Sequence, residues 1–134
     1  MIQRVQSLYL LTVSVLGILF CVFPFGEAGG ETLGYASWWP FAVVSTLIPA
    51  LAFASLFLFR KRVLQMRLNS LNAILIIMQA LVAVLIVYLR PGAESAFRPL
   101  WPVTLPPIEV ILTLLAIRAI AKDEVLVRAA DRLR

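Results

Sequence analysis

The stretch "SLNAILIIMQALVAVLIVYL", residues 70–89, decides the fold class of this chain. It carries no charged side chain, and most of its residues are leucine, isoleucine, valine or alanine. A helix rises about 1.5 Å per residue, so a run of this length spans about 30 Å, the thickness of the hydrocarbon core of a bilayer. The stretch therefore predicts a membrane-spanning helix.

The composition of the whole chain agrees with this prediction. Of its 134 residues, 62% are hydrophobic and only 14% are charged, and the mean hydropathy is +0.97. Soluble domains are about 45–50% apolar and about 25% charged. Because a small domain has little interior, the surplus of apolar side chains must face lipid. The length fits a single membrane domain covering residues 1–134.

Three further apolar runs complete a set of four spans. We place the spans at about residues 5–25, 38–59, 70–89 and 103–120, followed by a polar helical tail at 121–134. Pro106 and Pro107 suit the first turn of the fourth helix, where a missing N–H costs little. The first run is longer than the apolar region of a signal peptide and is interpreted as an uncleaved anchor. The predicted fold is an all-α integral membrane protein, a four-transmembrane-helix bundle.

The distribution of basic residues predicts the orientation of the bundle. Ten of the twelve lie on one side of the predicted membrane: Arg4, Arg60, Lys61, Arg62, Arg67, Arg118, Lys122, Arg128, Arg132 and Arg134. The other side has Arg90 and Arg98. Since short cytoplasmic segments are enriched in Lys and Arg, both termini are expected in the cytoplasm, with the fourth helix extended into it.

Glu109 is the acidic residue that falls inside a predicted span. A carboxylate in hydrocarbon is costly, so it should be protonated, paired or in contact with water. One interpretation is a site that couples to protons or cations. The alternative is that the prolines start the helix late and leave Glu109 near its first turn, within reach of interfacial water. Gln79, at the centre of the third span, lies at a similar depth and could hydrogen-bond to Glu109, although such polar groups more often hold helices together.

The segment "RKRVLQMR", residues 60–67, concentrates positive charge in one short loop. Arg60, Lys61, Arg62 and Arg67 are candidate contacts for anionic lipid headgroups, each contributing about 1 kcal/mol near a membrane surface. The orientation of the chain alone would also require a basic loop here.

Several chemistries are excluded by the residues that the sequence lacks. There is no histidine, and Cys21 is the single cysteine, so we expect no metal centre, no cofactor and no disulfide. We find no arrangement of nucleophile and base, no phosphate-binding glycine loop and no nucleic-acid-binding motif. The sequence therefore predicts a protein that is not an enzyme and does not bind nucleic acid.

The two ends of the chain carry a resemblance to a known family. The stretches "MIQRVQSLYLL" at 1–11 and "LAIRAIAKDEVLVRAADRLR" at 115–134 are similar to a bacterial family of small four-span membrane proteins, found mainly in Bacteroidota and classified as domain of unknown function 4293. The matching positions are Ile2, Gln3, Arg4, Gln6, Tyr9, Arg118, Ala119, Lys122, Asp123, Glu124, Leu126, Val127, Arg128, Asp131, Arg132, Leu133 and Arg134. The resemblance implies a multi-pass protein of the bacterial inner membrane and supplies no activity or substrate. Glu109 lies outside the matching pattern.

The tail residues suggest a docking face on the cytoplasmic side. Glu124 and Arg128 stand four residues apart, the spacing of a helix-surface ion pair. The candidate face comprises Arg4, Arg118, Lys122, Asp123, Glu124, Arg128, Asp131 and Arg132. The leading functional hypothesis is a non-enzymatic scaffold, assembly factor or accessory subunit that meets a partner membrane protein or a second copy of itself within the lipid bilayer. The alternative is a small proton- or cation-coupled transporter or channel that uses Glu109.

Overall fold

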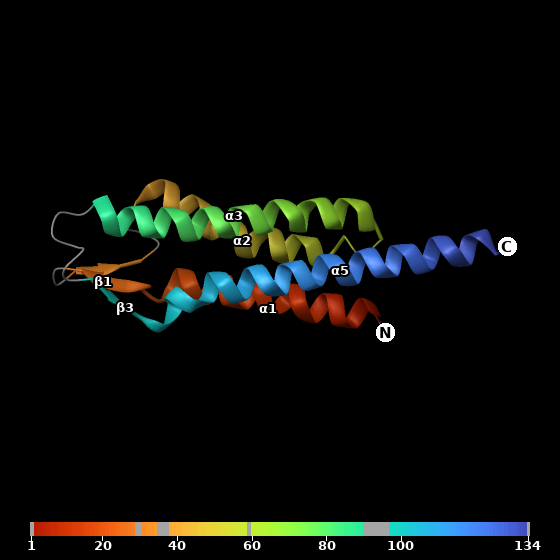
Figure 1. Ribbon diagram of the computed structural model, residues 1–134, viewed down its shortest axis with the longest axis horizontal. Coiled ribbons are helices and arrows are strands. Elements are labelled where there is room, and N and C mark those ends of the chain that lie inside the picture. Colours follow the sequence, from red (N-terminus) through yellow and green to blue (C-terminus); the bar gives the residue numbers. More distant parts are fainter. Residues whose placement is uncertain (1, 29–30, 35–37, 59, 90–96, 134) are drawn as a thin grey trace.

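The computed structural model describes residues 2–28, 31–34, 38–58, 60–89 and 97–133 and shows a bundle of four long helices (Figure 1). Helix α1 covers Ile2–Val22, α2 covers Trp39–Leu56, α3 covers Arg62–Leu89 and α5 covers Leu105–Arg132. A short 3-10 helix, η2 at Trp101–Thr104, leads into α5. All four long helices are long and apolar enough to cross a membrane. The predicted all-α four-helix bundle is confirmed.

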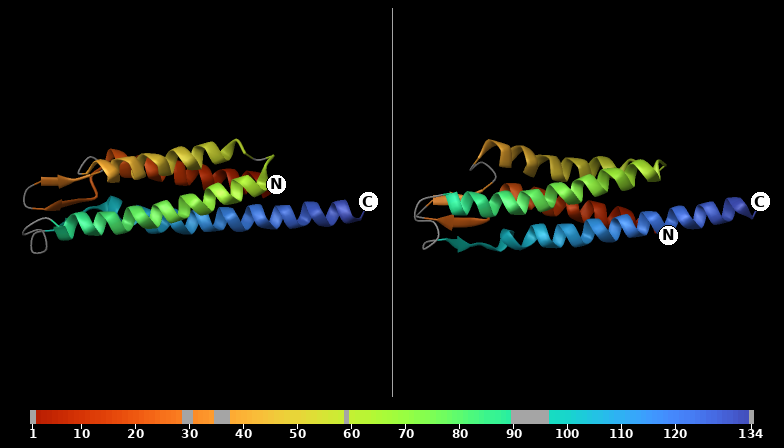
Figure 2. Two further views of the ribbon diagram at one scale, coloured as in Figure 1. Left: turned by 90° about the horizontal axis from the view of Figure 1, so that it is seen from above. Right: turned by 45° about the horizontal axis from the view of Figure 1, so that its top comes forward.

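The helices form a ring in which each packs against two neighbours. Helix α1 contacts α2 and α5, and α3 contacts the same two helices. Figure 2 shows that they run nearly antiparallel along one axis. One end of the bundle holds the N-terminus, the connection from α2 to α3 and the last turns of α5, and we call it the basic end. The opposite end holds the short strands, and we call it the sheet end.

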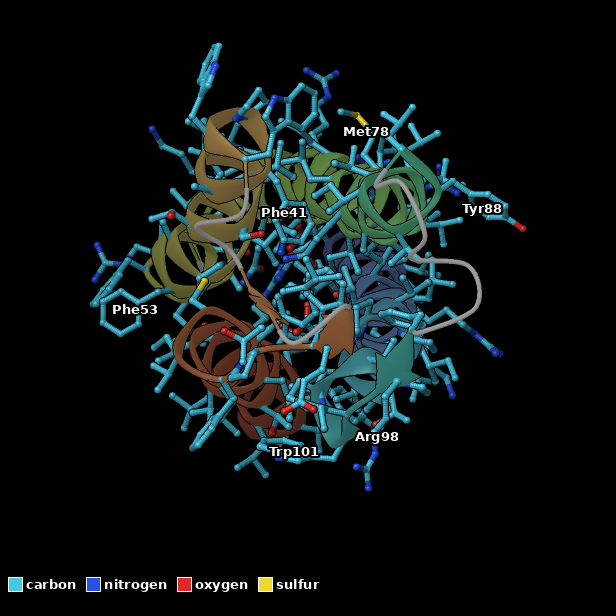
Figure 3. All side chains as sticks on the ribbon, turned by 90° about the vertical axis from the view of Figure 1, so that its left-hand side faces the viewer. Phe41, Phe53, Met78, Tyr88, Arg98 and Trp101 are labelled. Carbon is cyan, nitrogen blue, oxygen red and sulfur yellow. The ribbon has the colours of Figure 1, made fainter. Side chains whose placement is uncertain are left out.

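Polar and apolar side chains are distributed as expected for a bundle surrounded by lipid. The buried residues recur at intervals of three and four, which places them along one side of each helix. On α3 they include Gln65, Asn69, Asn72, Ile76, Gln79 and Ile86. Large apolar side chains cover the outside, and in Figure 3 Phe53, Met78 and Tyr88 point away from the bundle. By helix length and composition, this is a multi-pass membrane protein.

A small antiparallel sheet covers one end of the bundle, a feature that we did not predict. Strand β1 (Gly26–Ala28) lies between β2 (Glu31–Leu33) and β3 (Arg98–Pro99). The backbone N–H of Leu100 also donates to the carbonyl of Phe25 at 3.0 Å. The sheet therefore joins the connection between α1 and α2 to the connection between α3 and α5.

An aromatic cluster lies inside the bundle next to the sheet. The rings of Phe20 and Phe25 stack with centroids 5.9 Å apart, and Phe41 meets both rings edge-on. Leu33, Ile86 and Leu105 pack into the same group, which we call the aromatic cluster. It closes the sheet end of the bundle axis with apolar side chains.

Helices α1 and α2 approach each other closely at a glycine and a proline. A β-carbon added to Gly17 would lie 3.1 Å from Cβ and Cδ of Pro49. Pro49 is inside α2 and is buried. The absence of a side chain at Gly17 thus makes room for the proline ring, as small residues do at membrane helix interfaces.

At the basic end, two helices extend beyond their most apolar segments. Helix α3 begins at Arg62, and α5 runs without interruption to Arg132. Figure 1 shows the end of α5 projecting past the other helices. The polar tail therefore continues the fourth helix, as predicted.

Candidate functional site

Glu109 lies in the interior of the bundle, completely shielded from solvent. Helix α5 starts at Leu105, so Glu109 belongs to its second turn. Its exposed fraction is 0%, and the aromatic cluster lies between it and the sheet end. The helix does begin at the prolines and leaves Glu109 near its start, as the alternative interpretation expected, but the side chain is buried in the bundle.

Each of the four helices contributes a polar side chain to the same region. Gln79 on α3 donates from Nε2 to Oγ of Ser45 on α2 at 2.9 Å. The thiol of Cys21 on α1 donates to the backbone carbonyl of Ser45 at 3.2 Å, and Glu109 on α5 is close enough to act electrostatically on that thiol. We call Cys21, Ser45, Gln79 and Glu109 the polar cluster.

The expected hydrogen bond between Gln79 and Glu109 is not formed. Both carboxylate oxygens of Glu109 lack a hydrogen-bond partner among the described residues, and so does Oε1 of Gln79. Gln79 instead donates to Ser45, because α2 also packs against α3 and brings its hydroxyl within reach. The carboxyl group that costs most to bury is thus the one that the described protein groups leave without a partner.

A line of buried polar side chains leads from Gln79 toward the basic end. Gln65 donates to the carbonyl of Ser55 on α2, and Asn69 donates to the Ser55 hydroxyl, both at 2.9 Å. Asn72 is 1% exposed, and within the described chain neither its amide nitrogen nor its amide oxygen has a partner. We call Gln65, Asn69, Asn72 and Gln79 the amide row.

An apolar groove of about 580 Å³ lies between α3 and α5 near the sheet end. Its lining includes Ala80 and Ala83 opposite Pro106 and Pro107, with Phe20 on the α1 side. Small residues on one helix facing prolines on the other leave this space. Apart from Tyr88 the residues that line the groove are apolar, and Glu109 is not one of them.

The four basic residues proposed to contact lipid headgroups do lie together. Arg60, Lys61, Arg62 and Arg67 line one surface depression at the basic end, together with Glu124. Arg62, however, is engaged within the chain. Its Nε lies 2.9 Å from Oδ2 of Asp123, and its Nη1 lies 3.5 Å from Oε2 of Glu124.

Some residues of the candidate docking face are engaged in these ion pairs, and its other tail residues are exposed. Asp123 and Glu124 are only 15% and 21% exposed because they meet Arg62. The predicted pair of Glu124 and Arg128 is confirmed, with Nε 3.0 Å from Oε1. The remaining tail members of the face, Arg118, Lys122, Asp131 and Arg132, are exposed.

Arg4 was expected to meet this tail. It lies on α1, but its side chain is outside the described part of the structure, as are Arg90 and Arg134 from the charge count. Nearby, Gln6 donates to the carbonyl of Ala119 at 3.2 Å, which ties the start of α1 to α5.

Two parts of the site could not be recognised from the sequence. The sequence analysis assigned no site role to Cys21 or Ser45, although polar residues spaced three and four apart within the spans were a usable signal. The pairing of Arg62 with Asp123 and Glu124 joins segments far apart in the chain. In the sequence it was signalled only by the opposite charges of these two segments. Within the residues that the structure describes, no three His, Cys, Asp or Glu side chains come close enough to hold a metal ion.

The chain belongs to the family described as domain of unknown function 4293, whose family model matches residues 2–133. Comparison with curated proteins and with solved structures found no match.

The ion pairs of Arg62 generate a testable prediction about the tail. Arg62→Ala should loosen the last turns of α5, because Asp123 and Glu124 lose their partner on α3. A partly exposed pair contributes about 0.5–1 kcal/mol, so amide hydrogen exchange over 121–132 should accelerate about two- to five-fold in lipid nanodiscs. Arg67→Ala, which removes the same charge from an exposed position on the same helix, is the matched control. Equal exchange in the two variants would contradict the assignment.

Proposed function

We propose that this protein is a non-enzymatic, multi-pass protein of the bacterial inner membrane that binds and releases a proton at Glu109 as part of a transport or channel activity. The observation that carries the proposal is a fully buried carboxyl group that has no hydrogen-bond partner in the described chain, inside a bundle whose other three helices contribute Cys21, Ser45 and Gln79. Ionisable groups inside a membrane bundle are costly and mark ion or proton sites.

The chemistry of the polar cluster supports a proton or a small cation as the ligand. A carboxyl group in this position avoids an uncompensated negative charge either by binding a proton or by pairing with a cation. The other members of the cluster are an amide, a hydroxyl and a thiol, which can donate or accept hydrogen bonds without adding fixed charge. Cys21 on α1 is a titratable group that interacts electrostatically with Glu109.

The topology proposed for this activity places both termini in the cytoplasm. The basic residues of the loop at 60–67 and of the tail lie at the basic end, while Arg98 lies at the sheet end. By the bias of basic residues toward the cytoplasm, the basic end faces inward. Glu109 is then separated from the outer surface by the aromatic cluster and the sheet.

The test is the charge displaced when protons bind. In proteoliposomes adsorbed on a solid-supported membrane, a jump in pH should produce a transient current in the wild-type protein. Glu109→Gln, which keeps the size and hydrogen-bonding capacity of the side chain, should remove most of this current. Glu27→Gln, which neutralises a carboxyl group on β1, should leave it. No current from the wild-type protein, or the same current from Glu109→Gln, would overturn the proposal.

A second candidate function is that of a scaffold, assembly factor or accessory subunit. The observation that favours it is the end of α5, which projects past the bundle with Val125, Leu126 and Leu133 exposed by 66%, 53% and 90%. Apolar side chains beside charged ones on a projecting helix suit packing against another helix. On this hypothesis the partner binds beyond the turn that Arg62 holds.

The scaffold hypothesis predicts a larger native assembly that depends on this helix end. Leu126→Asp should shift the protein, gently extracted from its own membrane, from an assembly with a reproducible second chain to a smaller particle. Ala129→Asp adds the same charge at another exposed position of α5 and should change the mass less. Native mass measurement distinguishes these results, and a wild-type protein that runs alone would remove the hypothesis.

A further inference from the structure

In the described part of the chain, buried polar side chains extend from the middle of the bundle toward one end only. Between Glu109 and the sheet end lie the aromatic cluster and the sheet. Toward the basic end, α3 instead presents the amide row, whose four members are at most 2% exposed. The two directions from Glu109 therefore differ, one being apolar and aromatic and the other lined with amides.

The atoms of the amide row that lack partners follow one another along the helix. Oε1 of Gln65, Oδ1 of Asn69, both polar atoms of Asn72 and Oε1 of Gln79 have no hydrogen-bond partner among the described residues. At about 1.5 Å per residue, Gln65 and Gln79 are separated by about 21 Å along α3, with Asn72 half-way. The spacing of three, four and seven residues keeps all four on the inner side of the helix.

Burying so many unpartnered polar atoms has a definite physical consequence. Each such group is costly to bury unless a hydrogen-bond partner satisfies it. Amide side chains on neighbouring turns that cannot all satisfy one another are bridged in proteins by bound water, which typically makes about three hydrogen bonds. Asn72 offers two donors and an acceptor at one point and is the strongest such position in the row.

We infer that a file of water molecules enters the bundle at the basic end and follows the amide row, through Asn72, to Glu109. This inference rests on the proposed function, for which it supplies the route and the side of proton entry. The row adds no fixed charge, so it suits a proton or small cation and leaves Glu109 as the group that takes it up. The ion pair of Arg62 with Asp123 lies beside the mouth, three residues from Gln65 along α3.

A second polar residue on α5 is buried on the same side of the helix as Glu109. Thr113, one turn toward the basic end, is fully buried and donates from its hydroxyl to the carbonyl of Glu109 at 2.7 Å. Its side chain therefore lies on the inner side of α5, between Glu109 and the predicted entrance. A water file that reaches Glu109 should pass it.

Silver ions test the route, since they travel with water through narrow passages and bind thiols. In a Cys21→Ser background, Asn72→Cys should be protected by silver from later maleimide labelling of the denatured protein. Protection should require silver on the side of the basic end, in sealed vesicles of known orientation. Ile74→Cys, at a similar depth but 57% exposed toward lipid in the wild-type structure, is the matched control and should remain unprotected.

Thr113→Cys keeps the test decisive if Asn72→Cys does not fold, because it replaces a side chain of nearly equal size. It should show the same one-sided protection, with at least a five-fold difference in the rate of protection between the two sides. Full labelling of both variants, or protection equal to that of Ile74→Cys, would overturn the inference. The outcome is independent of the pH-jump current. Protection without a current would support the water route and refute proton binding at Glu109. A current without protection would support proton binding at Glu109 and refute the water route.

Discussion

The burial of polar side chains inside a bundle whose outer surface is apolar is the constraint on which this structure depends. In lipid, apolar side chains gain little by packing against other helices, so hydrogen bonds and close packing must hold the helices together. Ser45 and Ser55 on α2 accept from Gln79, Asn69 and Gln65 on α3. Such bonds average about 0.6 kcal/mol each in membrane proteins, so they fix the pairing of helices more than they add stability.

Glu109 departs from this pattern of paired groups, as Asn72 does, and it is the one of the two that can carry a charge. Its neighbours Ser45, Cys21 and Gln79 are joined to one another, while its carboxylate is joined to none of the described residues. A group that served only to hold helices together would be expected among the hydrogen-bonded ones. The aromatic cluster lies on one side of the carboxyl group and the amide row on the other, and the proposed proton route follows from this difference.

At the basic end, ion pairs join α3 to the tail of α5. Arg62 joins the start of α3 to Asp123 and Glu124 on α5 and so fixes the part of the tail that lies against the bundle. Beyond it, the last turns of α5 are exposed and make no contribution to the interior. The tail therefore has two parts, one that is joined to the start of α3 by ion pairs and one whose side chains are exposed.

Much of the fold followed from the sequence, because four long apolar runs have few alternatives in a chain this short. The continuous fourth helix and the pair of Glu124 with Arg128 were predictable from local spacing alone. The sheet was not, since strands of two or three residues carry no periodic pattern. The partner of Gln79 was not predictable either, because it depends on α2 and α3 being neighbours, and no pattern within one helix states that order. Depth along the membrane identified Glu109, but its complete burial depends on how the four helices pack, which no pattern within one helix states.

The most direct test of the account is whether water reaches Glu109 in a bilayer. Solid-state NMR can measure how fast magnetisation passes from water to individual side chains of the protein in lipid. The account predicts that the carboxyl carbon of Glu109 receives it nearly as fast as the side chain of Asn69, and several-fold faster than Ile86 in the aromatic cluster. Transfer to Glu109 as slow as transfer to Ile86 would show a carboxyl group sealed from water on every side, and would contradict the account.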